Sequence, residues 1–390
     1  MPSARRFALV TTNFHPRVCG IGDFSARFGA ELLRRGHEVA VFSRGPVAPN
    51  PEAPEVQAHA VEGRLPTAVA RNVVEALRAF RPTDVLIQYT AQMWDAWRFG
   101  TFAPALVAWE ARRLGARVSL FAHELFFSFA SRPDLAVAAA AQRLELAALL
   151  PLCDTVYVTT GTRADSIKEA CRWLGTRPPG IMRIGANALP VERRRPPGPP
   201  RLGIFSTAAA NKRFDVALEA FERVARELPD AELVLIGALG PPERPLVRRV
   251  LDDVARHPAR DRIRLTGSLT LPEVSREIAD LDVYLFPMST GANTRSGTLP
   301  AALGARLPTI AIRGDETDPA LFVDGENIVF AREMSGAAFA DAALGLLRDP
   351  AWRARVAAGA RRLYDEHLSW EATVAHFLAA GPSGEMMAGS

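Results

Sequence analysis

The chain has 390 residues, more than one hydrophobic core usually supports, which predicts two domains. Apolar residues make up 48% and charged residues 23%, as in ordinary globular proteins, and a net charge of +4 is too small to indicate nucleic-acid binding. No run approaches the ~18 to 20 apolar residues of a membrane-spanning helix, so we expect a cytoplasmic protein, with peripheral membrane contact left open.

The first half alternates short apolar runs with helical segments. A strand at residues 7–12 is followed by a loop and by a helix from near Asp23, in which Phe24, Phe28 and Leu32 form one apolar face. The next strand, at 37–42, completes a βαβ unit of a parallel sheet. Further strands are expected at 84–89, 117–122 and 155–160. Residues 1–190 are therefore predicted to form an open α/β domain.

Residues 191–201 contain four arginines, four prolines and one glycine, a composition that fits neither a helix nor the interior of a sheet. We expect the interdomain linker there and a second α/β domain at 202–365. A helix at 366–380 is expected to pack back toward the first domain, and 381–390 to form a flexible tail. The predicted strands of the second domain are 201–206, 231–237, 262–267, 283–287, 308–312 and 327–330.

The predicted fold class is α/β, with two Rossmann-like doubly wound domains facing a cleft. In such sheets ligands bind beyond the carboxyl ends of the strands. Within the second domain we expect a helix from about Arg213 to Glu227. Thr270 and Glu273 have the spacing of a capping box at the start of another helix.

A polar stretch from Ser289 to Pro308 lies between two predicted strands. Its loop ends at Ser296, and a short helix follows with Pro300 in its first turn, where a missing N–H costs nothing. N–H groups at the helix start, beside Arg295, suit a phosphate or diphosphate. The alternative is an ordinary strand-to-helix connection.

The loop around Gly20 and Gly22 is close to a dinucleotide-binding fingerprint, but seven residues separate it from its strand. The strand after it is followed by Arg44, which would accept an NADP phosphate, so an NADP-dependent oxidoreductase is one alternative. We favour a glycine loop that lets a ligand approach the backbone, with Asp23 at the helix start. A plain N-cap turn is the other interpretation.

Two further positions are candidate site residues. His123 follows a strand directly, where it is either bonded to backbone groups or directed at a ligand. Lys212 and Arg213 stand at a helix start, where basic side chains oppose the helix dipole and favour a bound anion. Solvated basic side chains are the alternative.

Several familiar chemistries are missing from the sequence. It has no GxSxG, P-loop or HExxH motif. Cys19, Cys153 and Cys171 lack metal-ligand spacing and are expected to be reduced thiols. The acidic run 315–318 is expected to be a loop, so we expect a reaction that needs neither metal nor cofactor.

Taken together, these stretches resemble the GT-B nucleotide-sugar glycosyltransferases, specifically the retaining family 4. The likeness covers nearly the whole chain through the order and spacing of its motifs. The donor loop of that family usually carries two glutamates, and here Asn293 and Ala301 stand at those positions; Thr207 stands near an expected arginine. The segments that carry the resemblance are 15–42, 154–167, 205–221, 281–308, 324–330 and the pair Trp370-Glu371.

The resemblance implies sugar transfer with retention from a nucleotide-diphosphate sugar to an acceptor that the sequence does not identify. Lys212, Arg295 and the N–H groups of Gly297 and Thr298 would stabilise the departing diphosphate, while His123 would lie over the sugar ring. A non-catalytic nucleotide-sugar binding protein is the main alternative. The residues expected to bind the donor are Gly20, Gly22, Thr207, Lys212, Asn293, Arg295, Ser296, Gly297, Thr298 and Leu299.

Overall fold

A computed structural model describes residues 4–17, 19–91, 93–94, 100–129 and 133–380. The chain divides into two compact units. The first runs to Arg183 and takes the chain again from Thr373, and the second comprises Ile184–Ala372. The predicted tail at 381–390 lies outside the described residues.

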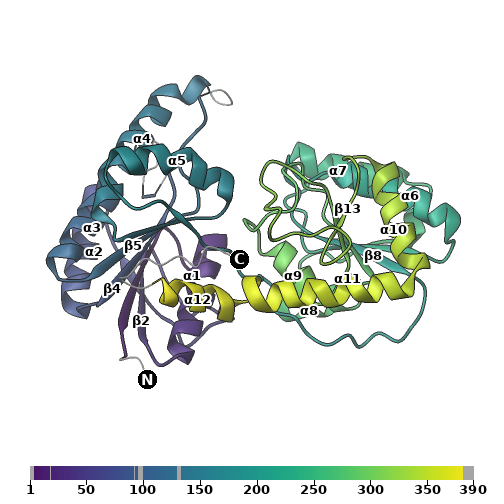
Figure 1. The fold of residues 1–390 in the computed structure, drawn as a ribbon, viewed down its shortest axis with the longest axis horizontal. Coiled ribbons are helices and arrows are strands. Elements are labelled where there is room, and N and C mark those ends of the chain that lie inside the picture. The colour runs from purple at the N-terminus through teal and green to yellow at the C-terminus, as the bar shows by residue number, and fades with distance from the viewer. Residues whose placement is uncertain (1–3, 18, 92, 95–99, 130–132, 381–390) are drawn as a thin grey trace. The chain divides into compact units, whose positions relative to one another are not determined.

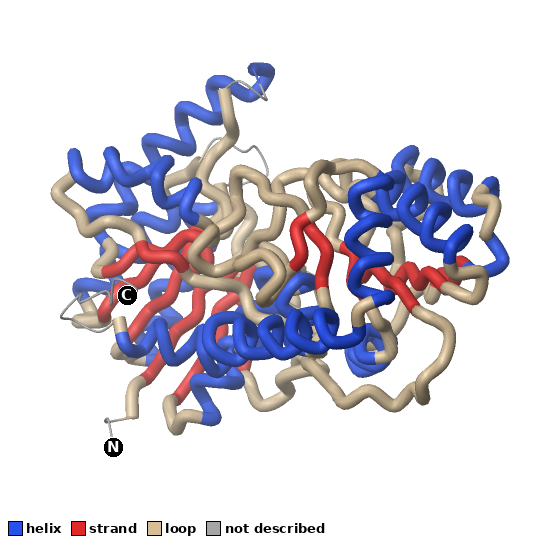
Figure 2. The backbone as a smooth tube through the Cα atoms, turned by 45° about the vertical axis from the view of Figure 1, so that its right-hand side comes forward, coloured by secondary structure: helices blue, strands red, loops and turns tan. Residues whose placement is uncertain are grey.

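The first unit is a seven-stranded, all-parallel sheet in the order β3-β2-β1-β4-β5-β6-β7 (Figures 1 and 2). Its strands are β1 (Arg6–Thr11), β2 (Glu38–Arg44), β3 (Gln57–Val61), β4 (Asp84–Tyr89), β5 (Arg117–Ala122), β6 (Thr155–Val158) and β7 (Gly180–Ile181). Its helices are α1 (Gly20–Arg34), α2 (Pro66–Phe80), α3 (Ala103–Arg113), α4 (Ala136–Leu149), α5 (Gly161–Trp173) and most of α12 (Trp370–Ala379).

Helices cover both faces of this sheet because successive β1 side chains point to opposite sides. Ala8 and Val10 belong to the core that includes α2 and α3. On the other face, Phe377 of α12 packs against Phe7 and against Phe28 of α1, with ring centroids 6.1 and 5.2 Å apart. The apolar face predicted for α1 is confirmed, since its three members are all buried.

The second unit is a six-stranded parallel sheet in the order β10-β9-β8-β11-β12-β13. Its strands are β8 (Arg201–Phe205), β9 (Glu232–Ile236), β10 (Ile263–Leu265), β11 (Val283–Leu285), β12 (Thr309–Ala311) and β13 (Val329–Phe330). Its helices are α6 (Phe214–Glu227), α7 (Pro245–Arg256), α8 (Leu271–Ala279), α9 (Thr298–Gly304), α10 (Gly336–Arg348) and α11 (Pro350–Leu363), which a π-helical turn (Tyr364–Leu368) follows.

In both sheets the strand order reverses beside the first strand of the unit, as in doubly wound Rossmann-like folds. The predicted fold class of two such domains is confirmed. The predicted capping box is also present, with the Thr270 N–H donating to the Glu273 carboxylate at 2.8 Å.

Some boundaries differ from those expected. Helix α1 begins at Gly20, before Asp23, because Asp23 N–H already donates to the Cys19 carbonyl and closes a first turn. Two short strands, β3 and β7, were not predicted. The Pro- and Arg-rich segment 191–201 lies within the second unit, where Arg193 and Arg195 pair with Asp282 at 2.8 and 3.2 Å.

In the part of the chain that the structure describes, none of the helices combines the length and apolar character needed to span a bilayer.

Candidate functional site

A pocket opens in the second unit where the strand order reverses, between β8 and β11. The loops that leave these strands are joined by backbone hydrogen bonds of 2.9 Å, from Arg213 N–H to the Pro287 carbonyl and from Ser289 N–H to the Asn211 carbonyl. They border a hollow of about 290 Å³, a volume that includes space open to solvent. Carboxyl-end crevices at such reversals are the usual ligand sites of open α/β sheets. The lining residues are Ile204, Phe205, Ser206, Lys212, Phe214, Tyr284, Leu285, Phe286, Pro287, Met288 and Thr298.

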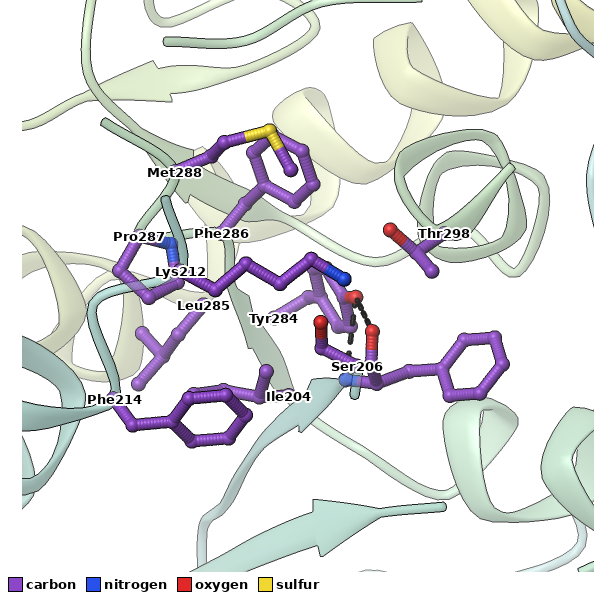
Figure 3. A pocket seen from close by; sticks show the side chains of 11 residues that line it. Ile204, Ser206, Lys212, Phe214, Tyr284, Leu285, Phe286, Pro287, Met288 and Thr298 are labelled. Atoms are coloured by element: carbon purple, nitrogen blue, oxygen red, sulfur yellow. Dashed lines mark hydrogen bonds between the residues drawn. The ribbon is translucent and has the colours of Figure 1, made fainter. Parts of the chain in front are cut away.

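Lys212 is the charged member of this lining. Figure 3 shows its side chain extending into the pocket, with the nitrogen end toward Tyr284 and Thr298. Burial lowers the pKa of the Lys212 ammonium below its ordinary value. Among the described residues no carboxylate pairs with this ammonium, whereas its neighbour Arg213 pairs with Asp215 at 2.6 Å. A cation without a partner among mainly apolar side chains attracts an anion strongly, because the local dielectric constant is low.

Arg295 is placed differently from its expected role. Its guanidinium forms an ion pair of 2.5 Å with Glu316, and it does not line the pocket around Lys212. The predicted acidic loop therefore contains a partner that neutralises Arg295. Sequence reasoning missed Glu316 in this role, because the two residues stand 21 positions apart and no local pattern links them.

Asn293 stabilises the loop at residues 289–297, here called the donor loop, through hydrogen bonds inside that loop. Its side chain is buried, and its amide donates to Thr290 Oγ1 at 3.1 Å and to the Gly291 carbonyl at 3.0 Å. Its Oδ1 accepts from the Arg295 N–H at 3.1 Å. The Asn293 side chain, which was expected to bind the donor, therefore makes its hydrogen bonds within its own loop.

Of the other predicted residues at 296–299, some lie at the pocket and others pack in the interior. Thr298 begins α9 and lines the pocket, whereas Leu299 is fully buried in the core. Ser296 Oγ lies 2.9 Å from Thr298 Oγ1. A Cβ on Gly297 would fall 2.0 Å from the side-chain oxygen of Asn187, so close packing requires glycine there.

Three other predicted residues show no ligand-directed contact of their own. Thr207 is exposed one residue beyond the pocket residue Ser206. Gly20 is the first residue of α1 and has open space where a side chain would stand. Gly22 is buried, and a Cβ on it would meet the Asn13 carbonyl oxygen at 3.0 Å, so this glycine permits close packing of α1 on the preceding loop. The residue weighed as an NADP-phosphate ligand, Arg44, donates instead to the Trp94 and Arg64 carbonyls.

His123 follows β5 and is buried within the first unit. Its Nε2 lies 2.6 Å from Gln88 Oε1, and its ring packs against the rings of Phe24 and Phe121. Arg163 donates to the His123 carbonyl. Burial, with a smaller effect from the Arg163 charge, lowers the pKa of the imidazole to about 3. His123 is therefore neutral at physiological pH, and its predicted contact with a sugar stays a prediction.

This buried histidine predicts a loss of stability in acid. The unfolded chain takes up a proton below pH ~6.5 and the folded chain does not, so unfolding is favoured as the pH falls. Between pH 7 and pH 5 the free energy of unfolding should decrease by about 2 kcal/mol more in the wild type than in His123→Gln. Urea titrations across this range measure the difference. Equal slopes in the wild type and His123→Gln would contradict the assignment.

Among the described residues, no group of three or more His, Cys, Asp or Glu side chains is arranged to hold a metal ion.

Comparison with known proteins identifies the domain that contains the pocket. Residues 199–349 match the family model of the Glycosyl transferases group 1. The chain therefore carries a group 1 glycosyltransferase domain. Lys212, Thr298 and the whole pocket lie inside the matched segment. No curated protein matches the chain.

Solved structures agree with the fold of this chain over nearly its whole length. Sucrose-phosphate synthase from Thermosynechococcus elongatus has a TM-score of 0.70 at 17% identity, over 96% of this chain and 98% of that one. Anabaena HepE, solved with UDP and glucose, has a TM-score of 0.70 at 13% identity, over 96% and 100%. A glycosyltransferase from Rickettsia africae has a TM-score of 0.71 at 11% identity, over 98% and 100%. The GT-B fold expected from the resemblance is confirmed.

Proposed function

We propose that this enzyme transfers a sugar from a nucleoside-diphosphate sugar to an acceptor, with retention at the anomeric carbon and without a metal ion. The observation that carries the proposal is the Lys212 ammonium in the pocket between β8 and β11, which no carboxylate of the described residues neutralises. The family match over this segment and the UDP and glucose bound in HepE support it.

The chemistry asks for charge stabilisation at the leaving group. As the bond from the anomeric carbon to the phosphate oxygen breaks, negative charge develops on the diphosphate, and a fixed cation lowers the energy of that state. The acceptor hydroxyl attacks on the face that the diphosphate leaves, and its proton passes to a diphosphate oxygen. Lys212 supplies the charge that a metal ion supplies in other transferases.

The neighbouring residues take supporting roles in this proposal. Thr298 and Ser206 offer hydroxyl groups along the pocket wall. Arg295 would reach a diphosphate only by leaving Glu316, so we assign the Arg295–Glu316 pair to holding the donor loop.

A thermal-shift panel of nucleotide sugars tests the donor. A ligand at 100 times its Kd stabilises the folded state by about 2.7 kcal/mol, which corresponds to a rise in Tm of about 5–10 °C. We expect such a rise with one nucleoside-diphosphate sugar and its nucleoside diphosphate, and no rise with NADPH. A rise with NADPH alone would contradict the proposal.

The stereochemistry and the metal requirement are tested on the donor that the panel selects. Proton NMR of the product should show the anomeric configuration of the donor. Saturating EDTA should leave the transfer rate unchanged, because the Lys212 ammonium, and not a removable metal ion, stabilises the leaving diphosphate. An inverted product, or loss of activity that Mg²⁺ or Mn²⁺ restores, would contradict the corresponding part of the proposal.

A further inference from the structure

Strands β8 and β11 pair over a very short distance. Their register joins Leu202 with Val283 and Gly203 with Tyr284, and the strands then diverge to open the pocket. Phe205, the last residue of β8, lies beyond the final pair. Its N–H and carbonyl therefore have no backbone partner on β11. Buried backbone groups without hydrogen-bond partners lower the stability of the folded state.

A side chain replaces the missing strand at this point. The Tyr284 hydroxyl donates to the Phe205 carbonyl at 3.1 Å and accepts from the Phe205 N–H at 3.2 Å (Figure 3). One buried hydroxyl of β11 therefore closes the end of β8, and both residues line the Lys212 pocket.

These bonds use the proton of the hydroxyl. A tyrosine hydroxyl has one proton and two acceptor positions. The proton goes to the Phe205 carbonyl, and the Phe205 N–H occupies one acceptor position. Burial raises the pKa of Tyr284, which keeps the proton in place. The hydroxyl proton therefore holds the fold and is not free to pass to a substrate.

We propose that Tyr284 is a positioning residue for donor binding, which fixes the wall of the diphosphate pocket by holding Phe205, at the end of β8, in place. The inference rests on the proposed function, because it concerns the pocket in which Lys212 meets the diphosphate. A phenylalanine at this position would keep the ring packing and leave the Phe205 backbone groups unsatisfied, so that the pocket wall relaxes.

Tyr284→Phe tests this role in the full chain. Isothermal titration with UDP, GDP and ADP should show the selected nucleoside diphosphate binding about 10-fold more weakly than to the wild type. Hydrogen exchange at the Phe205 amide should become faster without any ligand. The control is Tyr157→Phe, which removes a buried tyrosine hydroxyl in the first unit and should leave nucleotide affinity unchanged.

The outcomes separate this inference from the proposed function. Unchanged nucleotide affinity in Tyr284→Phe would overturn the positioning role, and unchanged exchange at Phe205 would overturn the contact itself. A wild-type protein that binds none of the three nucleotides would overturn the proposed function instead. Should Tyr284→Phe not fold, hydrogen exchange at the Phe205 amide of the wild type is compared with and without the selected nucleoside diphosphate. Binding should slow this exchange, and an unchanged rate would overturn the inference.

Discussion

Lys212→Ala is expected to lower kcat/KM for the nucleotide-sugar donor about 100- to 1000-fold, on the scale of losing one preorganised charge-stabilising group. The ammonium lies in a pocket lined mostly by apolar side chains, where its interaction with a developing anion is strong. The loss should appear in kcat as well as in KM, because diphosphate charge is greatest in the transition state. Steady-state kinetics with the donor selected by thermal shift measure both.

Arg213→Ala is the matched control for the charge. Arg213 is the next residue along the chain, but Asp215 already neutralises it. Its removal should change kcat/KM less than about threefold, because exposed ion pairs contribute little. Lys212→Arg should recover part of the activity, since the charge remains while its position changes. Equal kinetics for Lys212→Ala and the wild type would remove Lys212 from the site.

The lowered pKa of Lys212 adds a pH effect to this experiment. Because burial disfavours the ammonium, Lys212 loses its proton at a lower pH than an ordinary lysine. Nucleotide affinity should therefore fall on the alkaline side in the wild type, and this fall should be absent from Lys212→Ala.

Gly291→Ala is expected to destabilise the second unit by about 3–5 kcal/mol, combining backbone strain with overpacking. Gly291 has a φ of +81°, and a Cβ there would fall 2.3 Å from the backbone nitrogen of Gly314 and 2.5 Å from Thr317 Oγ1. The overlap of this Cβ with Gly314 is relieved only if the donor loop and the loop around Gly314 move apart. Since the Gly291 carbonyl also accepts from Asn293, nucleotide binding should weaken in the same variant.

Gly267→Ala measures the destabilisation from backbone strain alone, without overpacking, in the same unit. Gly267 has a φ of +68°, but no atom lies within 4 Å of the point that a Cβ would occupy. Its substitution should cost only about 1–2 kcal/mol and leave nucleotide affinity unchanged. Urea denaturation and nucleotide titration of both variants give the comparison. Similar stabilities for the two would show that the donor loop does not depend on contact between Gly291 and Gly314.

Local patterns in the sequence predicted many, but not all, of the elements of the fold. The four-residue spacing of Phe24, Phe28 and Leu32 predicted the buried face of α1, because side chains four apart lie on one face of a helix. The Thr270–Glu273 spacing predicted the start of α8. Such signals act between near neighbours, so they persist whatever the tertiary structure. The edge strand β3 carried no comparable signal, since most of its side chains are not buried.

Lys212 is the residue of the candidate pocket that local sequence alone singled out, because a basic residue at a helix start after a strand favours a bound anion. The tertiary structure decided which other groups share its pocket. It pairs Arg295 with Glu316 and directs the Asn293 amide to the carbonyl of Gly291 within the same loop. It also places the Tyr284 hydroxyl within hydrogen-bond distance of the last residue of β8. These pairings join residues from separate elements, and their partners depend on how the strands diverge in space, which no local spacing specifies.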